Sequence, residues 1–261
     1  MLEREPNFEN LKEDLLNLKT NHYLVGLKGG TEVEAMTFEE IKVMKEISNG
    51  IVPMTVKIGG PEARNDINYM LSIGIDKILA PMIESPYGLK NFVETMEELD
   101  KEHKAKFAIN METIFAYSNI HYIFQSPYFW MIEQVTVGRT DLSGSMNRDP
   151  DDFEVLKITK RIIELAKFYN KKTSIGGKVD SVNAINLKES INSDYLNTRH
   201  MVVSTESLDI SDDIRFALIW EKNFYTYLKS IFPERAELYN KRITSINVRS
   251  INVHAKEKAT V

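Results

Sequence analysis

Short apolar runs of strand length alternate with segments of helical character along most of this chain, and this alternation constrains the fold strongly. Strands that are joined through helices lie parallel in one sheet. Such runs begin at His22, Val52, Lys77, Lys106, Ile132, Lys172 and Arg199. Their number and spacing favour a (β/α)8 TIM barrel over an open sheet. The pattern does not locate the eighth strand, which either precedes Phe8 or is irregular.

No linker rich in proline, glycine or serine divides the chain, so we expect a single domain over residues 1–261. The barrel core is expected over residues 22–205, followed by a C-terminal helical segment and tail over residues 206–261. The helix predicted from Ile210 to Tyr239 carries many large apolar side chains. These either cover the barrel of the same chain or form a subunit interface, where aromatic residues are enriched. The tail from Ser245 is expected to be extended.

The composition excludes several classes of protein. The chain has 261 residues, of which 43% are hydrophobic, and this suffices for a sizeable core. Its net charge of −5 argues against nucleic acid as the main partner. No apolar run is long enough to span a membrane, and the N-terminus is too charged for a signal peptide. Without cysteines there are no disulfides or zinc–sulfur sites, and a cytoplasmic protein without a membrane partner is the default expectation.

Two acidic residues follow neighbouring strands of the predicted barrel. Glu112 ends the run Phe107–Met111, and Asp141 closely follows Val135–Val137. Because the carboxyl ends of parallel strands open on the same side of the sheet, both carboxylates are expected to face one pocket. Hard oxygen ligands suit a divalent ion such as Mg²⁺ or Mn²⁺. The sequence therefore predicts a metal site at Glu112 and Asp141, although both residues are also possible helix N-caps.

The other strand ends are rich in charged residues and glycine, and they supply further candidates. We expect catalytic roles for Lys57, Lys28 and Glu32, and substrate-binding roles for Gly59, Gly60, Arg139 and Thr140. Glycine pairs allow the backbone to approach a ligand closely. Each assignment has a structural alternative: Lys28 and Glu32 can form a surface ion pair, Arg139 can pair with a neighbouring carboxylate, and the glycines can form tight turns. Arg199 starts a predicted strand and is expected at the opposite end of the barrel.

Three segments of the chain carry a family resemblance: ILAPMIES (78–85), NMETIFAYSNI (110–120) and VGRTDLSGSM (137–146). With these motifs the chain resembles the HpcH/HpaI aldolase and citrate lyase family of the phosphoenolpyruvate/pyruvate barrel superfamily, over roughly residues 22–205. The resemblance implies a barrel fold and a metal role for Glu112 and Asp141. It also implies an enolate-type carbon–carbon bond reaction on a 2-oxo acid or acyl thioester, and a homo-oligomer in which the last helix packs on another subunit. A trimer or hexamer is expected ahead of a dimer.

Two positions depart from the pattern of this family. The family usually has Arg where this chain has Lys57, and its aldolase branch uses a His where this chain reads KGGTEVEAM (28–36). Lys57 can still neutralise an enolate oxygen, although it lacks the bidentate fork of Arg. Proton transfer is then assigned to Lys28, Glu32, Glu34 or metal-bound water.

The leading interpretation is a metal-dependent carbon–carbon lyase or aldolase that acts through a pyruvate-type enolate on a 2-oxo acid. One alternative is a citrate-lyase-like or citrate-synthase-like enzyme that acts on an acyl thioester or oxaloacetate. An alternative from another class is a catalytically altered barrel that binds a metabolite, and the missing Arg and His favour it.

Overall fold

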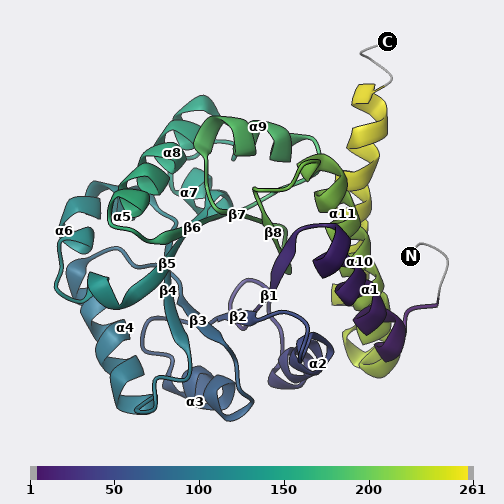
Figure 1. Ribbon diagram of the computed structural model, residues 1–261, viewed down its shortest axis with the longest axis horizontal. Coiled ribbons are helices and arrows are strands. Elements are labelled where there is room, and N and C mark those ends of the chain that lie inside the picture. Colours follow the sequence, from purple (N-terminus) through teal and green to yellow (C-terminus); the bar gives the residue numbers. More distant parts are fainter. Residues whose placement is uncertain (1–4, 258–261) are drawn as a thin grey trace.

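The computed structural model describes residues 5–257 and shows a closed barrel of strands surrounded by helices (Figure 1). Neighbouring strands pair in sequence order from β1 to β8, and β8 closes the barrel against β1. The TIM-barrel prediction is therefore confirmed. The strands are β1 (Leu24–Gly30), β2 (Met54–Lys57), β3 (Lys77–Ala80), β4 (Lys106–Met111), β5 (Ile132–Gly138), β6 (Lys172–Gly176), β7 (Tyr195–Asn197) and β8 (Met201–Ser204).

Helices fill the connections between the first seven strands, precede β1 and follow β8, and they cover the outside of the barrel. They are α1 (Phe8–Asn21), α2 (Phe38–Ser48), α3 (Arg64–Ser72), α4 (Pro86–Leu99), α5 (Ile114–Ser118), α6 (Ile120–Phe124), α7 (Arg139–Ser145), α8 (Phe153–Phe168), α9 (Asn183–Ile191), α10 (Ile210–Ile231) and α11 (Ala236–Glu257), with short 3-10 turns at Phe129–Met131 and Pro233–Arg235. Local sequence sets several helix starts. Thr37 and Glu40 form a capping box at α2, and Ser85 caps α4 ahead of Pro86.

The strand that the sequence pattern missed is β7, and its neighbour β8 runs in an unexpected direction. The first seven strands are parallel, whereas β8 is antiparallel to both β7 and β1. The reason is the length of the connection. Only Thr198–His200 link β7 to β8, and a parallel pair needs a crossover of a dozen or more residues. The start of β8 therefore lies at the same end of the barrel as the carboxyl ends of the other seven strands.

The C-terminal segment folds back on the barrel of its own chain. The Ile210–Tyr239 helix is divided at Pro233, so that α11 packs against α10, and α1 covers α10 from another side (Figure 1). Trp220 is 1% exposed, and Phe224 and Leu228 are equally buried. The centre of the apolar face that suggested a subunit interface is therefore covered within the chain, whereas Ile231 at its end is 39% exposed, and the homo-oligomer stays a prediction. The expectation of an extended tail was wrong as far as Glu257, and residues 258–261 lie outside the described residues.

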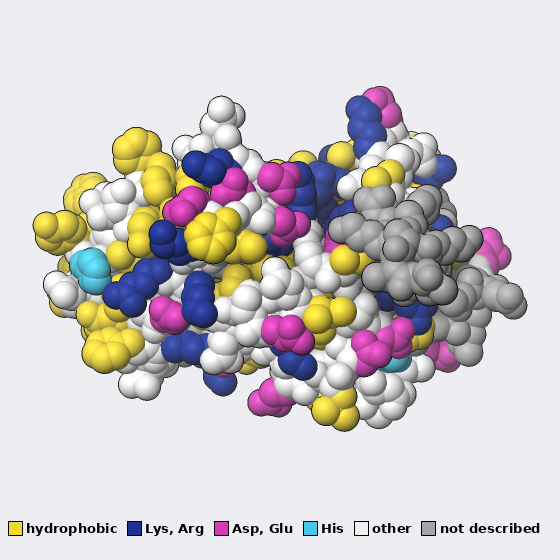
Figure 2. Space-filling model, turned by 90° about the horizontal axis from the view of Figure 1, so that it is seen from above, with side chains coloured by type: hydrophobic (Ala, Val, Ile, Leu, Met, Phe, Trp, Pro, Cys, Tyr) yellow, Lys and Arg dark blue, Asp and Glu magenta, His cyan; other side chains and the backbone are white. Residues whose placement is uncertain are grey.

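The surface of the molecule carries charges of both signs. Figure 2 shows acidic and basic side chains interspersed on one face of the molecule. None of the helices within residues 5–257 combines the length and the apolar character that crossing a membrane requires.

Candidate active site

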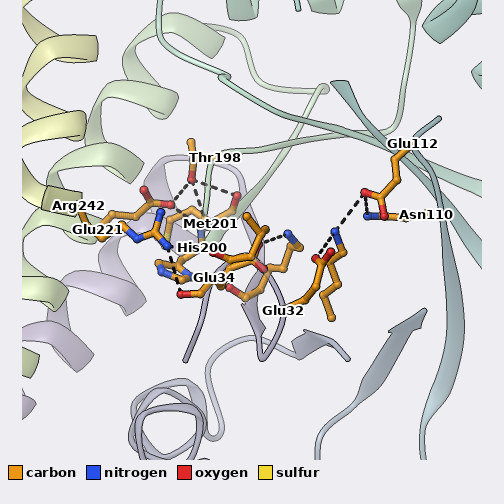
Figure 3. Close-up of polar contacts among 12 residues, drawn as sticks. Glu32, Glu34, Asn110, Glu112, Thr198, His200, Met201, Glu221 and Arg242 are labelled. Atoms are coloured by element: carbon orange, nitrogen blue, oxygen red, sulfur yellow. Dashed lines mark hydrogen bonds and ion pairs between the residues drawn. The ribbon is translucent and has the colours of Figure 1, made fainter. Parts of the chain in front are cut away.

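A buried lysine lies between two carboxylates where β1, β2 and β4 end. Lys57 Nζ is 2.6 Å from Glu32 Oε2 and 3.1 Å from Glu112 Oε2 (Figure 3). The side chains of Lys57 and Glu112 are 2% and 1% exposed, whereas that of Glu32 is 26% exposed. Glu112 also accepts hydrogen bonds from Asn110 Nδ2 at 2.6 Å and from the Met82 backbone N–H at 3.0 Å. The predicted residues Lys57, Glu32 and Glu112 are thus brought together.

Burial and neighbouring charges have opposing effects on the pKa values of Lys57 and Glu112. Burial acts to lower the pKa of Lys57, but the charges of Glu112 and Glu32 outweigh it, and the pKa is raised above its usual range. Lys57 is therefore a permanent cation at neutral pH. Burial raises the pKa of Glu112, and the charge of Asp141 adds to this effect, while Lys57 opposes it.

Asp141 lines the same cavity as Glu112, in the first turn of α7 directly after β5. Its carboxylate makes no hydrogen bond or ion pair within the described part of the chain. Gly138 at the end of β5 allows the close approach between β5 and Glu112, because a Cβ atom there would lie 2.6 Å from Glu112 Oε2. The two predicted metal ligands therefore share one cavity, one held rigidly and the other free of protein partners.

A second polar cluster occupies the neighbouring part of the barrel mouth. Lys28 Nζ donates to Glu34 Oε1 at 2.7 Å, and the backbone carbonyl oxygen of Lys28 lies 2.8 Å from His200 Nδ1. Burial opposes ionisation of Glu34, but the Lys28 charge and hydrogen bond lower its pKa to about 2. Lys28 pairs with Glu34 and not with Glu32, so the surface ion pair considered from the sequence is replaced by a buried one.

His200, Tyr225 and Glu221 complete this cluster, and the sequence analysis assigned none of them a role. His200 Nε2 lies 2.5 Å from the Tyr225 hydroxyl, and burial lowers the pKa of His200 to about 4. Glu221 accepts from Thr198 Oγ1 at 2.5 Å and from the His200 backbone N–H. A sequence signal for the turn that carries His200 was present. The interval between Tyr195 and Met201 is short, so it fits a tight turn and leaves no room for a crossover helix.

Four predicted substrate-binding residues differ in their placement. Thr140 lines the cavity of Glu112 and Asp141. Arg139 is fully buried, and its guanidinium donates to Pro150, to Asp151 at 2.5 Å and to the Gly177 carbonyl at 2.7 Å. This is the carboxylate pairing considered as its alternative, and all of these contacts are within the protein.

The glycine pair after β2 lies outside the lining of this cavity. The Gly59 N–H donates to Asp66 at 2.8 Å, whereas nothing lies within 4 Å of a Cβ built on Gly60. The substrate-binding roles of Gly59, Gly60, Arg139 and Thr140 stay predictions.

Two cavities meet inside the barrel. The one at the carboxyl ends of the strands has about 130 Å³ and holds Lys57, Glu112 and Asp141. A larger one of about 370 Å³ opens at the other end, where Lys77 and Lys106 pair with Glu133. The boundary between the two cavities is formed by Lys28, Thr136 and Asn197, which line both of them. We assign the chemistry to the smaller cavity, because reactive groups of such barrels gather at the carboxyl ends of the strands.

Comparison with known proteins identifies the family that this arrangement resembles. A sequence profile described as HpcH/HpaI aldolase/citrate lyase matches residues 54–175, which include Lys57, Glu112 and Asp141. The resemblance to the HpcH/HpaI aldolase/citrate lyase family is confirmed. The match supports an enzyme with a lyase-type function. No curated protein sequence matches the chain significantly.

Solved structures of HpcH/HpaI proteins share the fold. A family protein from Burkholderia cenocepacia J2315 superposes with a TM-score of 0.60 at 13% identity, and the match covers 74% of this chain and 84% of that chain. An HpcH/HpaI aldolase from Desulfitobacterium hafniense DCB-2 gives a TM-score of 0.58 at 15% identity, covering 72% and 81%. The citrate synthase SbnG gives 0.55 at 15% identity, covering 74% and 82%. At these identities the likeness shows the fold alone.

The HpcH/HpaI family generally depends on a divalent metal, and the residues of this cavity fit one. Mg²⁺ is commonly held by one or two carboxylates together with water and substrate. Glu112 and Asp141 supply two carboxylates, and the described residues contain no cluster of three or more potential His, Cys, Asp or Glu ligands. The repulsion that Asp141 exerts on Glu112 is what a bound cation would relieve.

Proposed function

We propose that this protein is a metal-dependent carbon–carbon lyase or aldolase that acts on a 2-oxo acid through a pyruvate-type enolate. The family match supports the lyase-type activity. The observation that carries the specific proposal is the buried ammonium of Lys57 between Glu32 and Glu112, in the cavity that Asp141 also lines.

Lys57 has the role of stabilising the enolate oxygen. Cleavage of the bond next to the carbonyl leaves negative charge on that oxygen, and a preorganised cation in a site of low dielectric stabilises the developing charge. The raised pKa of Lys57, in which the charges of Glu112 and Glu32 overcome the effect of burial, keeps this cation in place at neutral pH. The same property makes Lys57 unsuitable as the base.

Glu32 is our choice for the group that accepts and returns the proton. It is 26% exposed and lies 2.6 Å from Lys57, so that it is next to the proposed enolate site and can exchange protons with solvent. Glu34 is a poor alternative, because the pairing with Lys28 that lowers its pKa to about 2 makes its carboxylate a weak base. Lys28 itself is occupied by the same pairing.

Glu112 and Asp141 are the residues that would hold the divalent ion. When bound there, the ion supplies a Lewis acid for the carboxylate and keto oxygens of the substrate. The protein contributes the rigidity of this site, since Asn110 and the Met82 backbone N–H fix the orientation of Glu112.

Exchange of the pyruvate methyl protons tests the proposal, because exchange requires enolate formation but no acceptor substrate. In D2O with Mg²⁺, the wild-type protein should exchange these protons, as followed by ¹H NMR. Glu32→Gln should slow exchange by about 10²-fold or more, as expected for loss of a general base. Glu94→Gln, a change of a surface carboxylate, is the matched control. Absence of exchange by the wild-type protein over a panel of 2-oxo acids would instead favour a metabolite-binding barrel or a thioester substrate.

A further inference from the structure

The reversed direction of β8 brings an arginine without a carboxylate partner to the mouth of the barrel. Arg199 lies in the three-residue turn between β7 and β8 and lines the cavity that holds Glu112 and Asp141. Its guanidinium makes no hydrogen bond or ion pair with the residues that the structure describes. The sequence-based expectation that Arg199 lies at the opposite end of the barrel was wrong, because it assumed a parallel strand.

The nearby carboxylates of Glu221 and Glu34 are each engaged elsewhere through one oxygen, Oε1, and neither forms an ion pair with Arg199 within residues 5–257. Glu221 accepts hydrogen bonds from Thr198 and the His200 backbone, and Glu34 is paired with Lys28. Figure 3 shows Thr198 and His200, the chain neighbours of Arg199, on the side of the mouth away from Glu112. Arg199 is therefore a cation with no assigned counter-charge in a cavity wall.

Helix α11 adds a second arginine to this cavity. It runs from the loop after β1, where Arg242 donates to the Val33 carbonyl at 2.9 Å, to the loop after β6, where Arg249 contacts the Val179 carbonyl at 3.5 Å. Arg249 lines the cavity, and its buried Nε has no hydrogen-bond partner among the described residues. Arg242 lies close enough to Arg199 to interact electrostatically, and burial together with the charge of Arg199 lowers the pKa of Arg242.

The charge of the whole lining is positive. Five basic side chains face three acidic ones in the lining, so the balance stays positive even when Glu32 beside Lys57 is added. The basic lining residues are Lys28, Lys57, Lys178, Arg199 and Arg249, and the acidic ones are Glu34, Glu112 and Asp141. Lys178 is an exposed rim residue that pairs with Asp149 at 3.8 Å. The excess positive charge is located at Arg199 and Arg249, because Lys28 and Lys57 have carboxylate partners.

We propose that Arg199 and Arg249 form a second anion-binding subsite that holds a distal anionic group of the substrate. This inference rests on the proposed function and extends it: the 2-oxo acid is a dianion, with one end at Lys57 and the metal ligands and the other at the two arginines. Guanidinium groups bind carboxylate and phosphate alike through paired hydrogen bonds, so either group suits the subsite.

Calorimetric titration with a matched pair of ligands tests the subsite. 2-Oxopentanoate and 2-oxoglutarate have the same chain length and differ in the terminal methyl or carboxylate. In the presence of Mg²⁺ the protein should bind 2-oxoglutarate at least about tenfold more tightly than 2-oxopentanoate, as expected for charge-assisted hydrogen bonds. Arg199→Gln and Arg249→Gln should each remove most of this advantage while leaving the affinity for 2-oxopentanoate unchanged. Arg161→Gln, at an exposed site on α8, should change neither affinity. A larger advantage for 3-phosphonopyruvate would identify the distal group as a phospho group.

Titration with inorganic phosphate separates this inference from the proposed function. If phosphate binding depends on Arg199 but no 2-oxo acid binds, the subsite stands and the proposed function falls. If 2-oxo acids bind but the dicarboxylate has no advantage and phosphate binds all variants equally, the subsite is overturned and the proposed function stands. If Arg199→Gln in the β7–β8 turn does not fold, Arg249→Gln on α11 still tests the subsite.

Discussion

Lys57 Nζ lies 3.1 Å from Glu112 Oε2, and both side chains are almost completely removed from solvent. Removing one partner of such a pair leaves an uncompensated buried charge, which typically costs about 3–5 kcal/mol of stability. Variants of either residue therefore affect folding as well as chemistry.

Asp141 provides the cleanest test of metal binding, because its carboxylate makes no hydrogen bond or ion pair within the described part of the chain. Asp141→Asn should weaken Mn²⁺ binding by about tenfold or more without a large loss of stability, since a neutral amide is a poorer ligand for a hard cation. Calorimetry with Mn²⁺ gives the affinity, and Asp212→Asn on the surface is the control. Equal Mn²⁺ affinity in wild-type protein, Asp141→Asn and Glu112→Gln would exclude this metal site.

Lys57→Ala should reduce the rate of pyruvate proton exchange by about 10²–10³-fold, by analogy with the loss of one oxyanion-hole donor. Lys57→Arg keeps the charge and should retain more of the rate than Lys57→Ala. The exchange rate is measured by ¹H NMR, and thermal unfolding shows whether each variant is folded. Equal rates in a folded Lys57→Ala protein would remove Lys57 from the mechanism.

Gly138→Ala should displace Glu112 without changing any charged residue. The added Cβ would lie 2.6 Å from Glu112 Oε2 and 3.1 Å from its Cβ, and Glu112 is fixed by Lys57 and Asn110. We expect weaker Mn²⁺ binding and slower proton exchange. Gly144→Ala in α7 is the control, because nothing lies within 4 Å of its Cβ. Normal metal binding by Gly138→Ala would mean that the close approach of β5 does not set the ligand geometry.

Acidification should destabilise the protein through His200. Burial lowers its pKa from 6.5 to about 4, so the unfolded chain binds more protons than the folded one between these values. Stability from this group is full above pH 6.5 and is lost as the pH falls to about 4, by about 3 kcal/mol in total.

Denaturant unfolding of wild type and His200→Gln at pH 7, 6 and 5 measures this effect. Glu34 contributes at lower pH, since the pairing with Lys28 that lowers its pKa to about 2 places its loss below pH 4.5. The variant should show a flatter dependence over the tested range. Parallel curves for the two proteins would show that His200 does not titrate as described.

Trp220→Ala should lower the free energy of unfolding by about 3–5 kcal/mol, as expected for truncation of a fully buried aromatic residue. The same change should leave the mass in solution unaltered, because Trp220 is covered by its own chain and its Nε1–H donates to the Leu11 carbonyl at 3.0 Å. Light scattering at micromolar concentration gives the mass, and a value at least twice the 30.1 kDa of one chain would agree with the predicted homo-oligomer. A change of mass in a folded Trp220→Ala protein would reinstate α10 as part of an interface.

The barrel and the central residues of the candidate site could be predicted because they depend on local patterns. Apolar runs of strand length report burial on both faces, and their alternation with helices requires parallel pairing. Lys57 ends one such run and Glu112 directly follows another, so their position at the mouth follows from the direction of their strands. Helix starts such as the one at Thr37 depend on local sequence, because a cap satisfies backbone donors within a few residues of itself.

The partners of these residues were decided by the tertiary structure. The sequence left a Lys28–Glu32 ion pair open as a structural alternative, but the loop after β1 turns so that Glu34 pairs with Lys28 while Glu32 pairs with Lys57. Arg139 follows a strand as closely as Asp141 does, yet its guanidinium turns into the protein. Side-chain pairing at a barrel mouth depends on contacts between segments far apart in sequence, which local spacing does not encode.

The sequence by itself determined the alternating units, the strand-end residues Lys57, Glu112 and Asp141, and the family resemblance that they carry. The tertiary structure alone decided that β8 is reversed, that Arg199 faces the mouth, and that α11 brings Arg249 beside it. The physical reason is a difference in range. Hydrophobic period and caps act over a few residues, whereas closing the barrel requires β8 to pair with β1 across most of the chain, and the three-residue turn after β7 permits that closure in the antiparallel direction.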